Sequence, residues 1–573
     1  MSRSSLPALL HRHAVAFGLG LFILALYIYS LCPDVYLIDS GELAAVSYTL
    51  GIAHPTGYPL YTLISYFFAH LPGEPIRNLN LLSALFSVCA AVFLFMIARQ
   101  ITRDALIPLL AVSLFAFAPI IWRVSVTNEV YPLTGLLIVI LIYLLNNMKD
   151  DRAFYLAMYL IGLSFTNHMM VFSLALPLLV YVIVVHRPGR RAISLGLVFL
   201  ALGLSLYLYV MARTSGGARL AWGNAENLQR LYWHVSGKQY QVWMFSASIT
   251  QVLKNLIDGL RLLAGNLLYV FAAPSLLGFL VLYRQHRGQF WLLLAVITAN
   301  LLYAVNYSIP DIESYYIPSF IMLTVSLTYG LRMLGKYAKP FLIIAAALAI
   351  PIVNYNSCTL RNNHFGMDFG RAHIASLPDS SLLITTYWDI YSPLMYLRQV
   401  RQERRDLVII DKELLRRTWY LQYLEREYPR FYARIRMPVE AYLVELRKFE
   451  YGRPYQPQVI QARYIDMLNS FVDAKLDKGV FFASPWPDDD LNQVRPHYPR
   501  TPFGLVHVIT QESRAAPFDF SRLELNRPPV VNDARLQYNL GIVRARFIDN
   551  IRYLQTIGNH EQAAKAREIL ESL

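Results

Sequence analysis

Charged side chains and cysteines are both scarce in this sequence. Asp, Glu, Lys and Arg make up only 16% of its 573 residues, and three residues are cysteine, whereas 55% are hydrophobic. A soluble globular protein carries about a quarter charged residues, so the shortage of charge excludes that class. The hydrophobic residues lie in long runs instead of being scattered, which indicates a multi-pass membrane protein.

The sequence also lacks a cleavage site after its first apolar run and a domain in which basic residues cluster. The first apolar run, 14–31, has no small-residue cleavage site after it, and Leu31 before Cys32 is a poor lipoprotein site. We therefore interpret this run as an uncleaved anchor and not as a signal peptide. The net charge is +14, but many basic residues lie in short loops between spans and form no basic domain with interleaved aromatics, which argues against nucleic-acid binding.

The apolar runs and the basic residues between them predict a topology. The runs cover 14–31, 79–98, 105–121, 133–146, 154–165, 169–185, 193–211, 264–283, 290–307, 317–333 and 340–353. Basic residues gather in alternate connections, at Arg3, Arg12, Arg99, Arg103, Lys149, Arg152, Arg187, Arg190, Arg191, Arg284, Arg287, Arg332, Lys336 and Lys339. Because Lys and Arg favour the cytoplasmic side, the N-terminus is predicted to be cytoplasmic.

The segment 154–185 could be one long span, but basic residues flank both of its ends. An even number of crossings is therefore required, and we predict a turn at 164–168. The total is then about eleven transmembrane helices, two of them short for the bilayer. Cys32 and Cys358 fall at outer ends of spans, where a disulfide is conceivable, whereas Cys89 lies within a span.

The residues after 353 are predicted to be extracytoplasmic and to fold differently. The runs LLITTYW, LVII, GVFFASP and GLVHVIT read as strands over 382–388, 407–410, 479–485 and 504–510, with helical stretches at 414–428 and 459–476 between them. We expect a membrane domain over 1–353 with a first outer loop at 32–78, and a soluble α/β domain with a partly parallel sheet over 354–533. A helical hairpin that resembles one tetratricopeptide unit follows at 534–573.

Ionisable and amide side chains gather in the predicted outer loops. They are Asp39, Glu42 and His54 in the first loop, Asn128 and Glu129 in the second, Asn167 and His168 in the third, Arg213, Arg219, His234 and Lys238 in the fourth, and Asp311 and Glu313 in the fifth. Polar groups at membrane depth are costly and call for a partner or a role. Five loops on one face could build a single site.

Each of these residues also has a purely structural interpretation. Asp39 and Glu42 fit the D-x-x-E pattern of a helix start, in which Asp caps the helix and Glu reaches back. The prolines beside His54 and Tyr58 shape turns. The amides and acids of the later loops could cap helices, and the arginines could contact lipid headgroups. The gathering of these residues on one face is stronger evidence for a functional site than any single residue.

A membrane enzyme with carboxylates just outside a leaflet suits a substrate that has a lipid tail, an interfacial phosphate and a reactive head group. Arg and Lys would hold the phosphate. A carboxylate would deprotonate an incoming hydroxyl, and the cations would stabilise the departing lipid phosphate. This chemistry is glycosyl transfer from a polyprenyl-phosphate sugar.

Five stretches resemble the DUF2723 membrane family, which includes transmembrane protein O-mannosyltransferases and is similar to the GT-C glycosyltransferases. They are DSGELAAVSYTLGIAHPTGYPLYTL (39–63), TNEVYPL (127–133), GLSFTNHMM (162–170), WHVSGKQY (233–240) and IPDIESYYIP (309–318). The resemblance covers about residues 14–333. Thr56 replaces the second proline of the family's frequent HPPGYP, which affects the loop more than the chemistry.

The resemblance implies residue roles. GT-C enzymes place an acidic catalytic residue in the first outer loop, here Asp39, with Glu42 as its neighbour in orientation or metal binding. The other stretches supply substrate-binding candidates: His54, Tyr58, Asn128, Glu129, Asn167, His168, Arg213, Arg219, His234, Lys238, Asp311, Glu313 and Tyr315. A divalent cation such as Mg or Mn is an open option, with Glu42, Asp311 and Glu313 as candidate ligands.

The expected activity is transfer of a hexose, by resemblance mannose, from a polyprenyl-phosphate donor to a Ser or Thr hydroxyl of an extracytoplasmic protein. Inversion is expected, because a base-assisted single displacement forms no covalent sugar intermediate. The alternatives are glycosylation of a lipid or lipid-linked glycan, a transporter of lipid-linked substrate, and a non-catalytic scaffold. The outer face is the periplasm in a bacterium and the ER lumen in a eukaryote.

Overall fold

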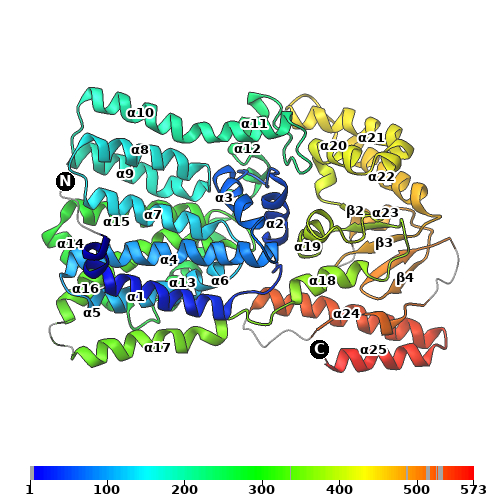
Figure 1. The fold of residues 1–573 in the computed structure, drawn as a ribbon. Coiled ribbons are helices and arrows are strands. Elements are labelled where there is room, and N and C mark those ends of the chain that lie inside the picture. The colour runs from blue at the N-terminus through cyan, green and yellow to red at the C-terminus, as the bar shows by residue number, and fades with distance from the viewer. Residues whose placement is uncertain are drawn as a thin grey trace. The chain divides into compact units, whose positions relative to one another are not determined.

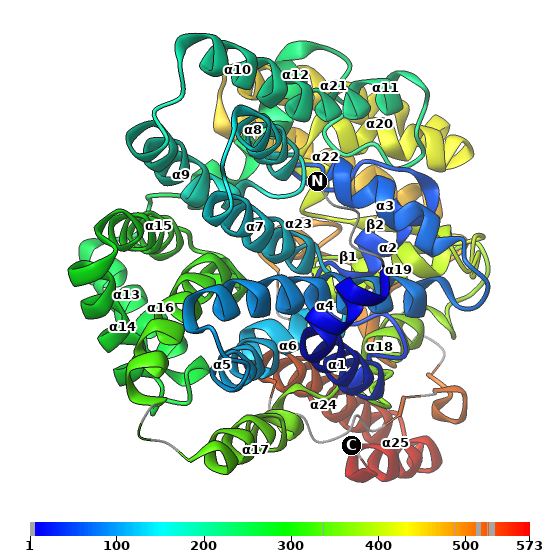
Figure 2. The same cartoon turned by 60° about the vertical axis from the view of Figure 1, so that its left-hand side comes forward.

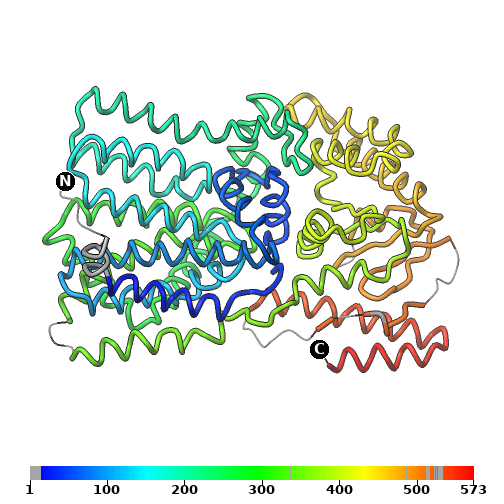
Figure 3. The backbone as a smooth tube through the Cα atoms, in the orientation of Figure 1, coloured from blue at the N-terminus to red at the C-terminus, as the bar shows by residue number. Residues whose placement is uncertain are grey.

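The computed structural model describes residues 6–335, 337, 339–485, 488–511, 517–523, 525–526 and 533–572, with side chains from residue 14 onward (Figure 3). Arg3, Lys336 and Leu573, which belong to the predictions above, lie outside these residues. The chain divides into two compact units. Unit 1 comprises Met1–Cys32, His54–Ala212 and Glu226–Arg361, and unit 2 comprises Pro33–Ala53, Arg213–Ala225 and Asn362–Leu573.

Unit 1 is built of helices, labelled in Figure 1. Its longer helices are α1 (Leu6–Ser30), α3 (Pro59–Ala69), α4 (Pro75–Thr102), α5 (Leu106–Phe117), α7 (Tyr131–Asn146), α8 (Asp151–Phe165), α9 (Phe172–Val185), α10 (Arg190–Leu204), α13 (Ile249–Asn266), α14 (Ala272–Gln285), α15 (Arg287–Val305), α16 (Ile317–Gly335) and α17 (Pro340–Cys358). Shorter ones are α6 (Pro119–Ser125), α11 (Leu208–Ser215, which ends in unit 2), α12 (Leu228–Val235), η1 (Met169–Val171), η2 (Ser205–Tyr207), η3 (Lys238–Trp243) and η4 (Ile312–Tyr316).

Helix α4 lies at the centre of this bundle, in contact with α1, α5, α7 and α16 (Figure 2). Proline occupies the first turn of α4, α6 and α17, where a missing N–H costs no hydrogen bond. Small residues let α14 and α16 approach closely, since a Cβ at Gly278 or Gly330 would meet backbone oxygen of the other helix. Helix α4 is thus the common packing partner of α1, α5, α7 and α16 in unit 1.

The expectation of an integral membrane protein is supported by the long apolar helices. Within the described residues five helices are long and apolar enough to cross a membrane, or six if α5 and α6, bent by 62°, form one span. Four shorter apolar helices add to these, including 14–30 and 131–146. The helix break predicted at 164–168 is present, since α8 ends at Phe165 and α9 begins at Phe172. The count of eleven crossings and the orientation of the N-terminus stay predictions.

Unit 2 contains a five-stranded sheet in the order β2-β1-β3-β5-β4. Its strands are β1 (Leu382–Thr385), β2 (Val408–Asp411), β3 (Val480–Ala483), β4 (Arg500–Phe503) and β5 (Val506–Ile509). Strand β1 pairs in parallel with β2 and β3, whereas β5 pairs antiparallel with β3 and β4. The sheet is therefore partly parallel, as expected, and the fully buried β1, β2 and β3 form its core.

The helices of unit 2 are α2 (Ser40–Thr49), α18 (Phe365–Ile374), α19 (Trp388–Gln399), η5 (Leu414–Arg416), α20 (Thr418–Glu427), α21 (Pro429–Glu450), α22 (Pro457–Lys475), α23 (Asp489–Gln493), η6 (Phe520–Arg522), α24 (Ala534–Thr556) and α25 (His560–Ser572). The predictions did not include β4, an edge strand that contains Pro502, or helix α21. Helices α24 and α25 pack on each other as a hairpin that turns at Gly558 and Asn559.

One feature of unit 2 departs from the linear domain boundaries expected from the sequence. Residues 33–53, which belong to the predicted first outer loop, group by contact with 213–225 and with the C-terminal residues. The reason is local: helix α2 packs along α19. The boundaries 1–353, 354–533 and 534–573 stay a prediction of domain organisation.

Candidate active site

The D-x-x-E stretch forms the start of α2. Asp39 occupies the N-cap position with φ −89° and ψ −6°, but its side chain makes no capping hydrogen bond. Its carboxylate is partly exposed, whereas Glu42 is fully buried. An N-cap Asp ordinarily accepts from the second or third helical N–H, which contributes about 1 kcal/mol. Side-chain capping, the structural interpretation of Asp39, is therefore absent.

The carboxylate of Asp39 is bound instead by helix α19. The indole Nε1 of Trp388 donates a hydrogen bond to Asp39 Oδ1 at 2.7 Å. Two further side chains of α19 bind the same stretch: Asp389 Oδ1 accepts from the backbone N–H of Ile38 at 2.8 Å, and Ser392 Oγ accepts from that of Glu42 at 3.0 Å. Helix α19 thus contacts the chain immediately before, at and after Asp39.

Sequence reasoning missed Trp388, Asp389 and Ser392. A signal was present, because Trp388 lies at the end of the predicted strand 382–388, and ligand sites of α/β sheets lie at the carboxyl ends of strands. Ile38 also has φ +62°. This backbone conformation is uncommon for a β-branched residue and persists only where its surroundings hold it. The bond from Ile38 to Asp389 is one such restraint.

Gly41 allows α2 and α19 to approach. A Cβ at this position would lie 2.2 Å from the backbone oxygen of Ser392. We therefore expect Gly41→Ala to force the helices apart and to lower the free energy of unfolding of unit 2 by about 1–3 kcal/mol. The thermal unfolding of the purified protein in detergent measures this effect.

Gly541→Ala is the matched control for this prediction. Gly541 lies inside α24, and a Cβ there would meet no atom within 4 Å. Alanine favours a helix over glycine by about 1 kcal/mol, so the unfolding temperature of this variant should not fall. If Gly41→Ala unfolded at the wild-type temperature, the close packing of α2 on α19 would be wrong.

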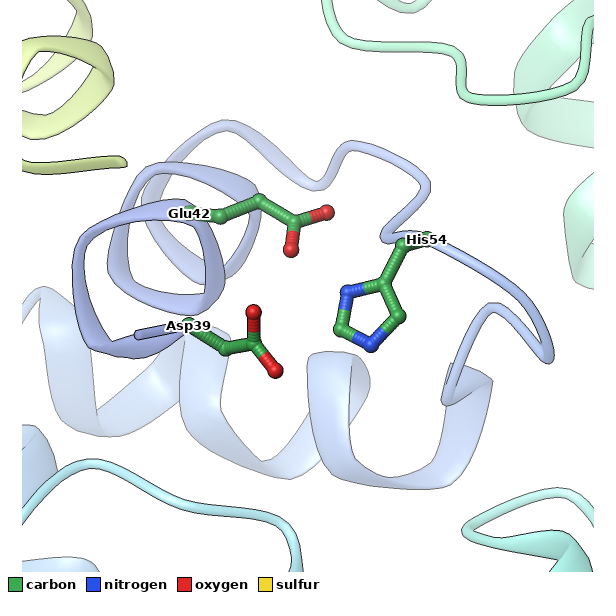
Figure 4. A group of neighbouring side chains, drawn as sticks. All are labelled: Asp39, Glu42 and His54. Atoms are coloured by element: carbon green, nitrogen blue, oxygen red, sulfur yellow. The ribbon is translucent and has the colours of Figure 1, made fainter. Parts of the chain in front are cut away.

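His54 lies a few residues after the carboxylates in the same stretch of chain. Figure 4 shows the side chains of Asp39, Glu42 and His54 directed towards one another, and one ligand atom from each lies within 4.8 Å of the others. Two carboxylates and an imidazole are ligands that suit several divalent metals. Among the described residues no other group of three such side chains meets this spacing, and the candidates Asp311 and Glu313 are not part of it.

Several predicted binding residues of unit 1 meet in an aromatic cluster. The hydroxyl of Tyr58 hydrogen-bonds with His54 Nε2 at 2.8 Å. The ring of Tyr58 stacks on that of His168, with centroids 5.8 Å apart. Tyr131 and Tyr315 each place their rings 5.3 Å from His168. The first, third and fifth predicted loops therefore do converge at His54, Tyr58, His168 and Tyr315.

His168 is a neutral member of this cluster. It is buried, and its Nδ1 accepts a hydrogen bond from the backbone N–H of Met170 at 3.1 Å, which caps η1. Burial, followed by the charge of His54, lowers the pKa of His168 to about 3. Because Nδ1 is an acceptor, the single proton of this neutral ring lies on Nε2. His168 can thus donate one hydrogen bond without carrying charge.

Other predicted residues make contacts within unit 1. Asn128 accepts from the hydroxyl of Tyr61, and Asn167 donates to Thr134 Oγ1 at 2.8 Å. Glu129 donates its backbone N–H to Ser83 Oγ at 3.2 Å, and buried His234 lies against Gly57. Asp311 precedes η4 without a side-chain cap.

The side chains predicted to bind phosphate interact with other groups of the protein. Arg219 binds buried Glu427 through two hydrogen bonds of 2.9 and 3.0 Å, and these bonds raise the pKa of Arg219. Arg213 Nε donates to the backbone oxygen of Leu50 at 2.8 Å. The ammonium of Lys238 lies 3.5 Å above the ring of Trp233. Arg219 is therefore primarily an ion-pair partner within unit 2.

Unit 1 contains a cavity of about 960 Å³, lined by α6, α13, η4 and the end of α15. Arg123 and Arg261 supply positive charge to its wall, and Glu313 and Asp258 supply negative charge. Only Glu313 of these was predicted. Arg123 follows an apolar run directly, so its position beside a cavity had no signal in the sequence.

Comparison with known proteins relates these features to a family. A family model described as the N-terminal domain of protein O-mannosyl-transferase TMEM260 matches residues 39–191, starting at Asp39. The protein O-mannosyl-transferase tmem260 of Dictyostelium discoideum is 22% identical, with 86% of this chain and 66% of that protein covered. TMEM260 of Mus musculus is 24% identical, with 68% and 61% covered. The chain thus spans just under two thirds of the length of these relatives.

Solved structures define the fold. ArnT from Cupriavidus metallidurans in the apo state aligns with a TM-score of 0.53 at 12% identity, over 86% of this chain and 97% of that one. The chain has the ArnT-like GT-C fold. The same ArnT bound to undecaprenyl phosphate aligns with a TM-score of 0.46 at 11% identity, over 89% and 99%. The named relatives and this fold support the expected membrane glycosyltransferase, and membership of the DUF2723 family stays a prediction.

Proposed function

We propose that the chain is a GT-C-type membrane glycosyltransferase that moves a hexose from a polyprenyl-phosphate sugar to a Ser or Thr hydroxyl of an extracytoplasmic protein. One observation carries the proposal: Asp39 begins a helix, yet its carboxylate is withheld from capping and bound by Trp388. The similarity to protein O-mannosyl-transferases supports mannose as the sugar.

Asp39 acts as the general base in this proposal. It accepts the proton of the acceptor hydroxyl while the oxygen attacks the anomeric carbon of the sugar, and the bond from that carbon to the phosphate oxygen breaks. The polyprenyl phosphate leaves with the bonding electrons. Because a single displacement occurs, the anomeric configuration inverts. Glu42, fully buried one helical turn later, lies beside Asp39 and His54 and orients the site.

The donor phosphate needs positive charge. Of the cations proposed from the sequence, Arg213 donates to the backbone oxygen of Leu50 and Lys238 lies over the Trp233 ring, so both stay candidates, whereas Arg219 is committed to Glu427. Arg123 and Arg261 are further candidates, since they line a cavity of about 960 Å³. That volume is at the upper end of typical small-molecule sites, and it would accommodate a sugar-phosphate head group. Tyr58, His54 and His168 supply hydrogen bonds and aromatic surface for the sugar.

Removal of divalent cations is expected to leave transfer intact. Asp39 Oδ1 already accepts from Trp388, and a carboxylate whose other oxygen bound a metal would lose the basicity that proton abstraction requires. The measurement is the transfer rate in membranes before and after treatment with EDTA. Loss of transfer that Mn²⁺ restores would contradict this expectation, and would make Asp39, Glu42 and His54 a cation site.

The function is tested by sugar transfer in membrane vesicles supplied with labelled polyprenyl-phosphate mannose. Protein and lipid extracts are counted separately. Label in protein supports the proposal, and label in lipid alone supports glycosylation of a lipid or lipid-linked glycan. No transfer, with the glucose and galactose donors also tried, would favour a transporter or a scaffold. The hairpin of α24 and α25 offers a surface for the acceptor protein.

A further inference from the structure

The first turns of α19 carry three side chains that bind three residues of the stretch 38–42, which contains the proposed base. Trp388 binds the Asp39 carboxylate, Asp389 binds the N–H of Ile38, and Ser392 binds the N–H of Glu42. The partners are separated by about 350 residues in the sequence. Their joint arrangement is therefore a product of the folded unit and not of local chain geometry.

We propose that Trp388 is a positioning residue for the proposed base. Its indole N–H, bonded to Oδ1, fixes the Asp39 carboxylate in one rotation for receipt of the acceptor proton. This inference rests on the proposed function. It assigns a part in glycosyl transfer to the C-terminal α/β unit, through a residue that acts by way of Asp39.

The chemistry of the indole group suits this task. Trp offers a single N–H donor and no acceptor, so it can orient a carboxylate but cannot take its proton. It is also neutral, whereas a Lys or Arg at the same place would stabilise the charged carboxylate strongly and weaken it as a base. One neutral hydrogen bond holds the orientation at the smallest cost in basicity.

The ring of Trp388 is itself held in place. Trp388 is the first residue of α19. Its ring packs against that of Trp222, with centroids 5.8 Å apart, and against that of Tyr391, with centroids 5.9 Å apart. Ser392 and Asp389 meanwhile hold the backbone on both sides of Asp39. The donor and the carboxylate are thus both positioned by packed structure, which is what a preorganised catalytic group requires.

The conformation of Asp39 at the start of α2 also supports a positioning role for Trp388. The backbone of Asp39, with φ −89° and ψ −6°, lacks the extended conformation typical of a capping residue, and its carboxylate binds Trp388 instead. The geometry favours orientation of the carboxylate over capping.

The test is Trp388→Phe, which keeps an aromatic ring and removes the N–H. Loss of one hydrogen bond to a charged group is expected to lower kcat by about 10- to 100-fold, with the KM values for donor and acceptor unchanged. Trp419→Phe is the matched control. Trp419 packs on Trp222 at 4.6 Å in the same aromatic cluster, and its buried indole N–H has no hydrogen-bond partner. This variant should keep the wild-type kcat.

A double-mutant cycle separates positioning from general damage. Trp388→Phe should cause no further loss in an Asp39→Asn background, because both changes act on the same group. An equal loss in both backgrounds, or a kcat of Trp388→Phe equal to that of Trp419→Phe, would overturn the inference. Transfer that persists in Asp39→Asn alone would instead overturn the proposed base, so the two failures are distinguishable.

A second variant guards against misfolding. Incorporation of benzothienylalanine at position 388 replaces the indole N–H by sulfur with almost no change in shape. It should reproduce the kcat loss of Trp388→Phe at the wild-type unfolding temperature. Full activity of this variant would show that the ring of Trp388 matters only for packing, and would overturn the proposal.

Discussion

Replacing Asp39 with asparagine is expected to lower sugar transfer by about 10²–10⁴-fold, the usual contribution of a general base. Asparagine has nearly the same shape, and its Oδ1 can still accept from Trp388, as Asp39 Oδ1 does at 2.7 Å. The fold should therefore survive while the proton acceptor is lost. The measurement is label transferred to protein in membrane vesicles, at equal expression of the two proteins.

Asp150→Asn is the matched control for this prediction. Asp150 is also an N-cap aspartate, and its side chain accepts from the N–H of Ala153 at 3.0 Å at the start of α8. Asparagine caps helices about as well as aspartate, so transfer should be unchanged. Full transfer by Asp39→Asn would assign the base to another residue or favour the transporter and scaffold alternatives.

Asp389→Ala is expected to destabilise unit 2 by about 3–5 kcal/mol, the usual effect of breaking a buried ion pair from one side. Asp389 is fully buried, and its Oδ2 accepts from Arg535 Nε at 2.7 Å, Asn539 Nδ2 at 2.8 Å and the hydroxyl of Tyr387 at 3.0 Å. Its Oδ1 binds the N–H of Ile38. Alanine would leave all four donors without this acceptor.

Thermal unfolding in detergent and resistance to protease measure this effect. Glu561→Gln provides the contrast, because Glu561 pairs with Lys565 along the exposed face of α25 at 2.9 Å. Exposed pairs of this kind contribute little, so no change in unfolding temperature is expected. An Asp389→Ala protein as stable as the wild type would show that the Asp389 network does not hold unit 2 together.

The Asp389 network also bears on the C-terminal hairpin. Arg535 and Asn539 both lie on α24, and Tyr36, three residues before Asp39, donates its hydroxyl to Asp533 at 2.8 Å. Deletion of 534–573 would leave Asp533 but remove Arg535 and Asn539, two partners of Asp389, and Asp389 in turn binds the N–H of Ile38 beside the base. Such a deletion cannot separate acceptor recognition from folding, and point substitutions on the exposed surface of the hairpin are the sharper experiment.

The sequence by itself determined the features that depend on neighbouring residues. Long apolar runs in a membrane form helices, because a helix satisfies its backbone hydrogen bonds internally. The helix break between Phe165 and Phe172 was predicted from the basic residues that flank 154–185 on both sides. Apolar runs at 382–388, 407–410 and 479–485 correspond to β1, β2 and β3, because such runs fit a buried parallel sheet, and the run 504–510 contains the antiparallel strand β5. The D-x-x-E pattern placed Asp39 and Glu42 at a helix start.

Only the tertiary structure decided what these residues contact. Strand β4 escaped prediction because Arg500–Phe503 contains a proline and pairs only at the sheet edge. The pairing of Arg219 with Glu427 and of Asp39 with Trp388 joins residues more than 200 positions apart. No periodicity or spacing encodes such pairs, since they form only when separate elements pack. Asp39 could thus be proposed as the base from the sequence, whereas Trp388, which orients its carboxylate, could be found only in the folded structure.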